Sequence, residues 1–148
     1  MACQSTTVEL RGQYEVHADT AGKDAAALFS FLQRRGYVLL AEGEVLPPAP
    51  PLLRPPSPLT GVDMIQAEKA GILSWSVNAG QWVKKGDLLG EILDPLDAFA
   101  EPLQLHARTD GLVYGMRWDR LAVPGDVVIK VAGDLPLEWR KGYLLTSR

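Results

Sequence analysis

The sequence predicts an α+β, mainly β protein, in which a strand and a helix precede an all-β domain. Three observations predict this. Residues 17–36 carry apolar side chains at helical spacing, residues 44–61 hold seven of the eleven prolines, and from Val62 onward short apolar stretches alternate with glycine. We therefore expect four parts: residues 1–43, a proline-rich linker over 44–61, a β domain over 62–133 and a tail over 134–148.

The stretch "STTVELRGQ", residues 5–13, predicts the first strand. Val8 and Leu10 alternate with Glu9 and Arg11 before Gly12 ends the run. Almost nothing precedes this strand for it to pair with. We therefore expect it to be the edge of a larger sheet that this chain does not itself supply.

A helix is predicted over residues 21–35. Asp19 or Thr20 is suited to cap its N-terminus, Arg34 and Arg35 suit the last turn, and Gly36 suits a left-handed stop. One strand cannot cover its apolar stripe, so we expect dimerisation or looseness at this end of the chain. The stripe comprises Ala21, Ala25, Leu28, Phe29 and Leu32.

The proline density of residues 44–61 excludes a helix or a central strand and favours an extended, stiff connector. The connector is read here as a spacer between two folded parts. The alternative is a ligand for an aromatic-lined proline-binding groove.

The β domain carries an internal repeat. "AEKAGILSW" from Ala67 resembles "ARTDGLVYG" from Ala107, and "VKKGDLLGEIL" resembles "AVPGDVVIKVA". Gly86 and Gly125 are expected to take positive φ in tight turns, the second preset by Pro124. Strand alternation then predicts two facing core rows: Leu88, Gly90 and Ile92, and Val127, Ile129 and Val131.

Composition excludes several classes of function. A formal net charge of −3 and a pI near 5.3 argue against a nucleic-acid binder or a protein of anionic membranes. The single cysteine, Cys3, allows no intrachain disulfide, and no apolar run has the length of a signal peptide or a membrane span. We expect a cytoplasmic protein. The four tryptophans are read as core or interface residues.

The repeat is similar to the pseudo-symmetric barrel-sandwich fold of biotinyl and lipoyl domains, which carry a modified lysine on the hairpin that joins their halves. Here that joint is "LDPLDAFAEPLQ", residues 93–104, which contains no lysine. Lys84 and Lys85 precede a Gly-Asp turn and are read as solvated turn residues. A biotin or lipoate carrier is therefore the least favoured reading.

The order of "TVELRG", helix, proline-rich connector and lipoyl-like module resembles the C-terminal portion of the succinylglutamate desuccinylase/aspartoacylase family. These are zinc-dependent deacylases related to the zinc carboxypeptidases. The resemblance implies a small N-acyl amino acid type of substrate and makes Glu9 the counterpart of the catalytic general base. Arg11 is a candidate to bind a substrate carboxylate, or else an exposed residue or a partner of Glu9.

The family's zinc ligands, a His-x-x-Glu motif and a later histidine, precede the glutamate strand and would fall before Met1. His17, His106 and Cys3 belong to no ligand motif, so no zinc is expected to be bound by this chain alone. We expect a truncated deacylase, inactive without a missing N-terminal segment or a homo-oligomer. The alternative is a non-enzymatic β module that binds a ligand or a protein.

Overall fold

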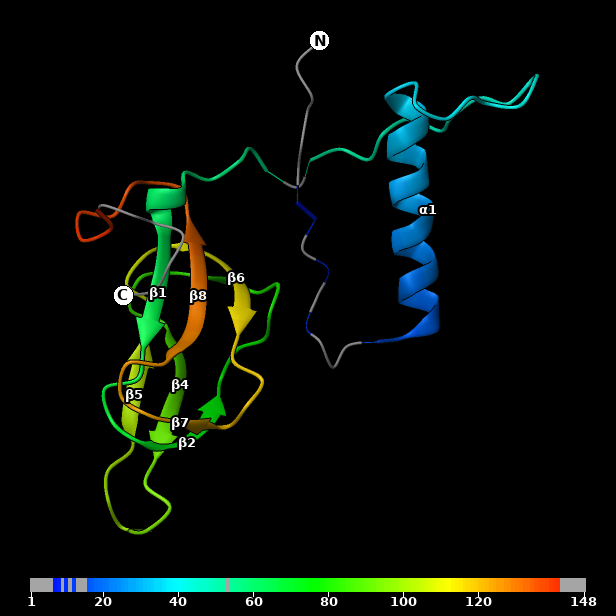
Figure 1. Ribbon diagram of the computed structural model, residues 1–148. Coiled ribbons are helices and arrows are strands. Elements are labelled where there is room, and N and C mark those ends of the chain that lie inside the picture. Colours follow the sequence, from blue (N-terminus) through cyan, green and yellow to red (C-terminus); the bar gives the residue numbers. More distant parts are fainter. Residues whose placement is uncertain (1–6, 9, 11, 13–15, 53, 142–148) are drawn as a thin grey trace. The chain divides into compact units, whose positions relative to one another are not determined.

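The computed structural model describes residues 7, 8, 10, 12, 16–52 and 54–141. The chain divides into two compact units, residues 1–52 and 53–148, each of which is described by itself. The second unit is mostly β, with two antiparallel sheets, and the first contains one helix (Figure 1).

Helix α1 runs from Ala18 to Arg34 and begins differently from the prediction. The capping position is His17, whose backbone is extended and whose side chain makes no capping hydrogen bond. Asp19 lies inside the first turn, where it accepts a hydrogen bond from Lys23 at 2.9 Å and has a favourable place near the positive end of the helix. The prediction of Asp19 or Thr20 as the cap was therefore wrong.

The C-terminal end of α1 confirms Gly36 as the stop. Its φ of +74° suits glycine, and its N–H donates to the Gln33 carbonyl at 3.0 Å. The Tyr37 N–H reaches back to the Leu32 carbonyl at 3.0 Å, which completes the 6→1 and 5→2 pair of a Schellman motif. No residue of α1 is buried, and no helix in the described part of the chain is both long and apolar enough to cross a membrane.

The predicted N-terminal strand is not seen in those of its residues that the structure describes. Residues 7, 8, 10 and 12 lie in neither a strand nor a helix. A strand is stabilised by backbone hydrogen bonds to a neighbour, and both sheets of the structure are built from residues after 61.

The proline-rich segment forms no helix or strand over residues 45–52 and 54–58, as predicted. Its last part belongs to the second unit. Arg54 pairs with Asp134, donates to Ser57 Oγ at 2.7 Å and places its guanidinium 4.8 Å from the ring centre of Trp82. These contacts fix the end of the connector on the β unit before the short 3₁₀ turn Leu59–Gly61.

One sheet has the strand order β1 (Val62–Gln66), β8 (Val127–Gly133), β6 (Gly111–Met116), β3 (Trp82–Val83). The other has the order β5 (Leu103–His106), β4 (Leu88–Leu93), β2 (Gly71–Trp75), β7 (Leu121–Ala122). Every strand of one order has a counterpart at the same place in the other: β1 and β5, β8 and β4, β6 and β2, β3 and β7. Strands β1 and β5 are therefore equivalent edge strands, each at the same end of its own sheet.

The core rows differ from the predicted rows by one residue at one end. Leu89 and Val128 are buried in the core, and Leu88 and Val127 are only partly buried. The pairing shifts between Leu88 and Gly90 against β5, and a matching shift against β1 leaves Val128 without an opposite residue. Each extra residue is a β-bulge, which reverses the alternation of faces. The predicted Ile92, Ile129 and Val131 do lie in the core.

The two Gly-Asp turns have the predicted conformation. Gly86 and Gly125 have φ values of +94° and +92°, which fit the second central position of a type II turn. Each turn is closed by the following aspartate, whose N–H and carboxylate bond the residue three positions earlier: Asp87 bonds Lys84, and Asp126 bonds Val123.

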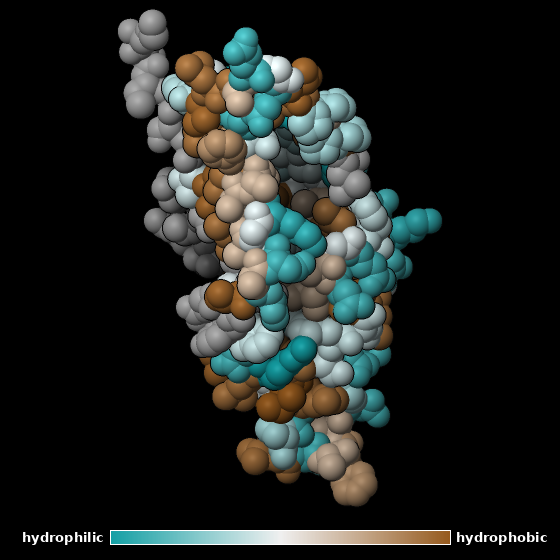
Figure 2. Space-filling view, turned by 90° about the vertical axis from the view of Figure 1, so that its right-hand side faces the viewer, coloured by the Kyte–Doolittle hydropathy of each residue, from teal (hydrophilic) through white to brown (hydrophobic). Residues whose placement is uncertain are grey.

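The loop between β4 and β5 exposes two apolar side chains. Leu96 is 95% and Phe99 98% exposed, and the loop is held by Asx turns in which Asp94 and Asp97 each accept the N–H two residues on. Figure 2 shows hydrophobic side chains at the lower end of the view, at the level of this loop in Figure 1.

Candidate functional site

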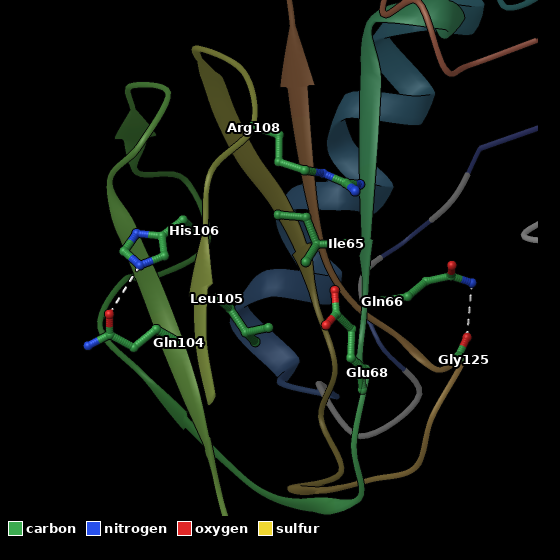
Figure 3. A pocket seen from close by; sticks show the side chains of 9 residues that line it. Ile65, Gln66, Glu68, Gln104, Leu105, His106, Arg108 and Gly125 are labelled. Carbon is green, nitrogen blue, oxygen red and sulfur yellow. Dashed lines mark hydrogen bonds between the residues drawn. The ribbon is translucent and has the colours of Figure 1, made fainter. Parts of the chain in front are cut away.

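A cleft opens between the edge strands β1 and β5. One wall is formed by residues 65–68, with Gly125 beside Gln66, and the other by residues 104–106 and Arg108 (Figure 3). The cleft is open to solvent along one side and has a volume of about 430 Å³. Its floor is apolar because Ile65, Ala67 and Leu105 point into the core.

Gln66 and His106 hold equivalent places on the two walls. Gln66 Nε2 donates to the carbonyl of the turn residue Gly125 at 3.0 Å, and His106 Nδ1 lies 2.9 Å from the carbonyl of the turn residue Gly86. A carbonyl oxygen only accepts, so this contact places a proton on Nδ1 of His106. The other ring nitrogen, Nε2, faces Gln104 Oε1 at 3.2 Å.

An ion pair crosses the upper end of the cleft. Asp63 is fully buried on β1, and Arg108 binds it bidentately, with Nε at 3.0 Å and Nη2 at 2.5 Å from its carboxylate oxygens. Arg108 Nη2 also lies 3.3 Å from the carbonyl of Met64, and its guanidinium lies 5.4 Å from the ring centre of Trp139. The pair cancels its own charge and ties the segment after β5 to β1 and to the tail.

The tail packs on the β unit, as far as the structure describes it. Besides the contact of Trp139 with Arg108, the Leu137 N–H donates to the Thr60 carbonyl at 2.9 Å. Trp75 packs against the core, whereas Trp82, Trp118 and Trp139 are more than half exposed. The tryptophans are thus mostly surface residues, and two of them carry an arginine on their rings.

Glu9 and Arg11, the predicted catalytic and substrate-binding residues, lie outside the described residues, as does Cys3. His17 precedes α1 and His106 lies in the cleft, in different units of the chain. Among the residues that the structure describes, no group of three His, Cys, Asp or Glu side chains is placed to hold a metal ion.

The Asp63–Arg108 pair was not predicted from the sequence. The signal was available: Asp63 is the one charged residue in the otherwise apolar stretch "GVDMI", where a buried charge requires a partner. Its partner lies 45 positions away, at a distance in sequence that no local pattern covers.

No family model matches the chain, and no curated protein does. Solved structures do. A putative succinylglutamate desuccinylase/aspartoacylase family protein from Shewanella amazonensis SB2B matches with a TM-score of 0.65 and 25% identity, over 84% of this chain and 33% of its own. The chain resembles the succinylglutamate desuccinylase/aspartoacylase family.

The apo structure of the ectoine utilization protein EutE (DoeB) from Ruegeria pomeroyi matches with a TM-score of 0.60 and 26% identity, over 80% of this chain and 36% of its own. A putative succinylglutamate desuccinylase/aspartoacylase from Shewanella frigidimarina NCIMB 400 has the same fold, with a TM-score of 0.68 at 21% identity, over 88% of this chain and 34% of its own. The chain therefore spans about one third of the length of each of these three structures.

Proposed function

We propose that this chain is the part of a zinc-dependent deacylase that does not bind the metal, and that the whole enzyme hydrolyses the amide bond of N-acyl amino acids. The observation that carries the proposal is the likeness to two solved structures at 25–26% identity over 80–84% of the chain, one of them named as a family protein. The motif "TTVELRG" at residues 6–12 supports the same family.

The described side chains do not fit a catalytic zinc ion, which needs three protein ligands and one open position. In this proposal another polypeptide segment supplies the zinc ligands, and the chain is active only when it is associated with that segment. Zinc, when bound there, supplies Lewis-acid chemistry at the scissile carbonyl.

In this proposal the chain itself supplies two groups that act on the substrate and a β unit that borders the substrate channel. Glu9 takes a proton from the attacking water and delivers it to the leaving amine, and Arg11 binds a carboxylate of the substrate. The β unit is a barrel-sandwich with a pseudo-two-fold repeat that borders the substrate channel. The corresponding strand orders of the two sheets and the two Gly-Asp turns support that description.

The test is reconstitution. The DNA upstream of the Met1 codon is first searched for a segment that encodes His-x-x-Glu. That segment is then produced together with this chain. The assay measures the release of amine from N-acetyl and N-succinyl amino acids. We expect turnover only when both are present. Glu9→Gln should lower kcat by roughly 10²–10⁴-fold, and Glu15→Gln should not. Full activity in Glu9→Gln, or the lack of any such segment together with no hydrolysis, would refute the proposal.

The second candidate is a ligand-binding β module without catalysis, which is favoured by the cleft between β1 and β5. A carrier is not favoured, because the loop between β4 and β5 has no lysine to modify.

A further inference from the structure

The cleft between β1 and β5 lies between two strand edges that differ in how open they are. On the β1 side, the Arg108 guanidinium lies 3.3 Å from the Met64 carbonyl. Strand β5 has no neighbouring strand on its cleft side among the described residues, and it contains no acidic residue, lysine, arginine or proline. Such an edge offers backbone N–H and C=O groups to a further strand, whose side chains can pack on the apolar floor. The cleft therefore fits an extended polypeptide segment that pairs with β5.

The described part of the tail leads to this cleft. The Leu137 N–H donates to the Thr60 carbonyl at 2.9 Å, and the ring centre of Trp139 lies 5.4 Å from the guanidinium of Arg108, which lines the cleft. Residues 142–148, "GYLLTSR", follow and lie outside the described residues. Extended, they span up to about 25 Å, whereas a strand as long as β5 needs about 14 Å. The segment is long enough to reach the cleft and pair along β5.

The sequence of this segment suits an edge strand with one apolar face. Tyr143 and Thr146 have high strand propensity, and the segment contains no proline and no acidic residue. In a strand, Tyr143 and Leu145 share one face, and Leu144 and Thr146 share the other. The face of Tyr143 and Leu145 is the more apolar of the two, so it is the face that matches the apolar floor of the cleft.

We propose that residues 142–148 bind as a strand in the cleft of their own molecule, antiparallel to β5. Figure 3 shows Arg108 at one end of the cleft and Gln104 nearer the other, and the chain arrives beside Arg108. The segment then runs from Arg108 toward Gln104, opposite to the direction of β5. A cleft filled in this way is closed to other ligands, so the segment competes with any ligand of the second candidate function. The inference does not depend on amide hydrolysis.

The experiment uses the full 148-residue chain, labelled with ¹⁵N, with a nitroxide spin label on the cysteine of the variant Cys3→Ser, Ser147→Cys. A nitroxide broadens the signals of nearby amides, and reduction of the label by ascorbate gives the reference spectrum. We expect the amide signals of residues 66–68 and 103–105 to lose most of their intensity. The signals of β3 and β7, at the opposite edges of the two sheets, should keep most of theirs.

Two variants of the spin-labelled chain test the apolar contact. Leu145→Asn removes the leucine that packs on the floor and should restore most of the intensity at residues 66–68 and 103–105. Thr146→Asn introduces the same side chain on the opposite face and should leave the broadening unchanged. In a mixed sample, ¹⁵N chain without the spin label is combined with spin-labelled chain of natural isotope content, and we expect no broadening.

Four results would overturn the proposal. Broadening in the mixed sample would assign the segment to the cleft of a second copy. Broadening confined to residues outside the cleft would place the segment elsewhere, and no broadening at all would show that it does not bind. Unchanged broadening in Leu145→Asn would remove the apolar match on which the proposal rests.

Discussion

Replacement of Arg108 by alanine removes both hydrogen bonds that the guanidinium donates to Asp63 and leaves a fully buried carboxylate without its counter-charge. Breaking a buried ion pair from one side costs about 3–5 kcal/mol. The Arg108 side chain is 48% exposed, so water screens the pair in part and the lower end, about 3 kcal/mol, is expected. With an m-value of about 1.5 kcal/mol/M, the urea midpoint falls by about 2 M.

The assay is urea unfolding followed by tryptophan fluorescence at neutral pH. Arg108→Lys keeps the charge but not the bidentate fork, so we expect a loss of about 1–2 kcal/mol. Arg120→Ala, which removes an exposed arginine from the same unit, serves as the control and should stay within about 0.5 kcal/mol of the wild type.

A double variant tests the reason for the loss. If the cost of Arg108→Ala is the stranded charge, then Asp63→Val combined with Arg108→Ala restores most of the stability, because an apolar replacement of the whole pair is often neutral. The reasoning fails if Arg108→Ala alone costs less than about 1 kcal/mol, or if the double variant is no more stable than Arg108→Ala.

Four further substitutions or conditions follow from the structure. His106→Gln should keep a hydrogen bond to the turn carbonyl, as glutamine does on the opposite wall, whereas His106→Ala should lose about 1 kcal/mol in urea unfolding. Gly90→Ala should prevent normal folding, judged by thermal unfolding, because its Cβ would lie 2.4 Å from a backbone oxygen of β2. Gly22→Ala meets no atom within 4 Å and should raise helicity in circular dichroism, by about 1 kcal/mol of helix stability. Burial raises the pKa of Tyr114, and the charge of Arg140 offsets part of that rise. This stabilisation is complete below the ordinary pKa of about 10 and is lost as the pH rises through the folded value, so the urea midpoint should fall as the pH rises above about 10, in parallel with tyrosinate absorbance.

Turns and stops were predictable from the sequence because each depends on a few adjacent residues. Gly36, Gly86 and Gly125 all have the positive φ that the sequence predicts, since few other residues adopt it without strain. The helix was predicted over residues 21–35 and is observed over Ala18–Arg34, so its start was predicted less accurately than its end. Several polar residues near the start are suited to the capping position.

The features that were not predicted, the β-bulges and the cleft, depend on residues that are far apart in the chain. The bulges at Leu89 and Val128 are set by pairing with β5 and β1, so alternation within one strand could not reveal them. The cleft likewise requires two edge strands 40 positions apart to lie side by side. Glu9 and Arg11 remain predictions of the sequence.

Arg108 has a consequence for how separate molecules meet. Strand β1 lies at the edge of its sheet, where unpaired backbone groups offer a template for a strand from another chain. The Arg108 guanidinium lies 3.3 Å from the Met64 carbonyl on that strand. A charged, half-exposed side chain therefore lies against the edge of β1. A strand from another molecule would have to displace this charge before it could pair with β1. Arg108, which neutralises Asp63, therefore also disfavours edge-to-edge aggregation.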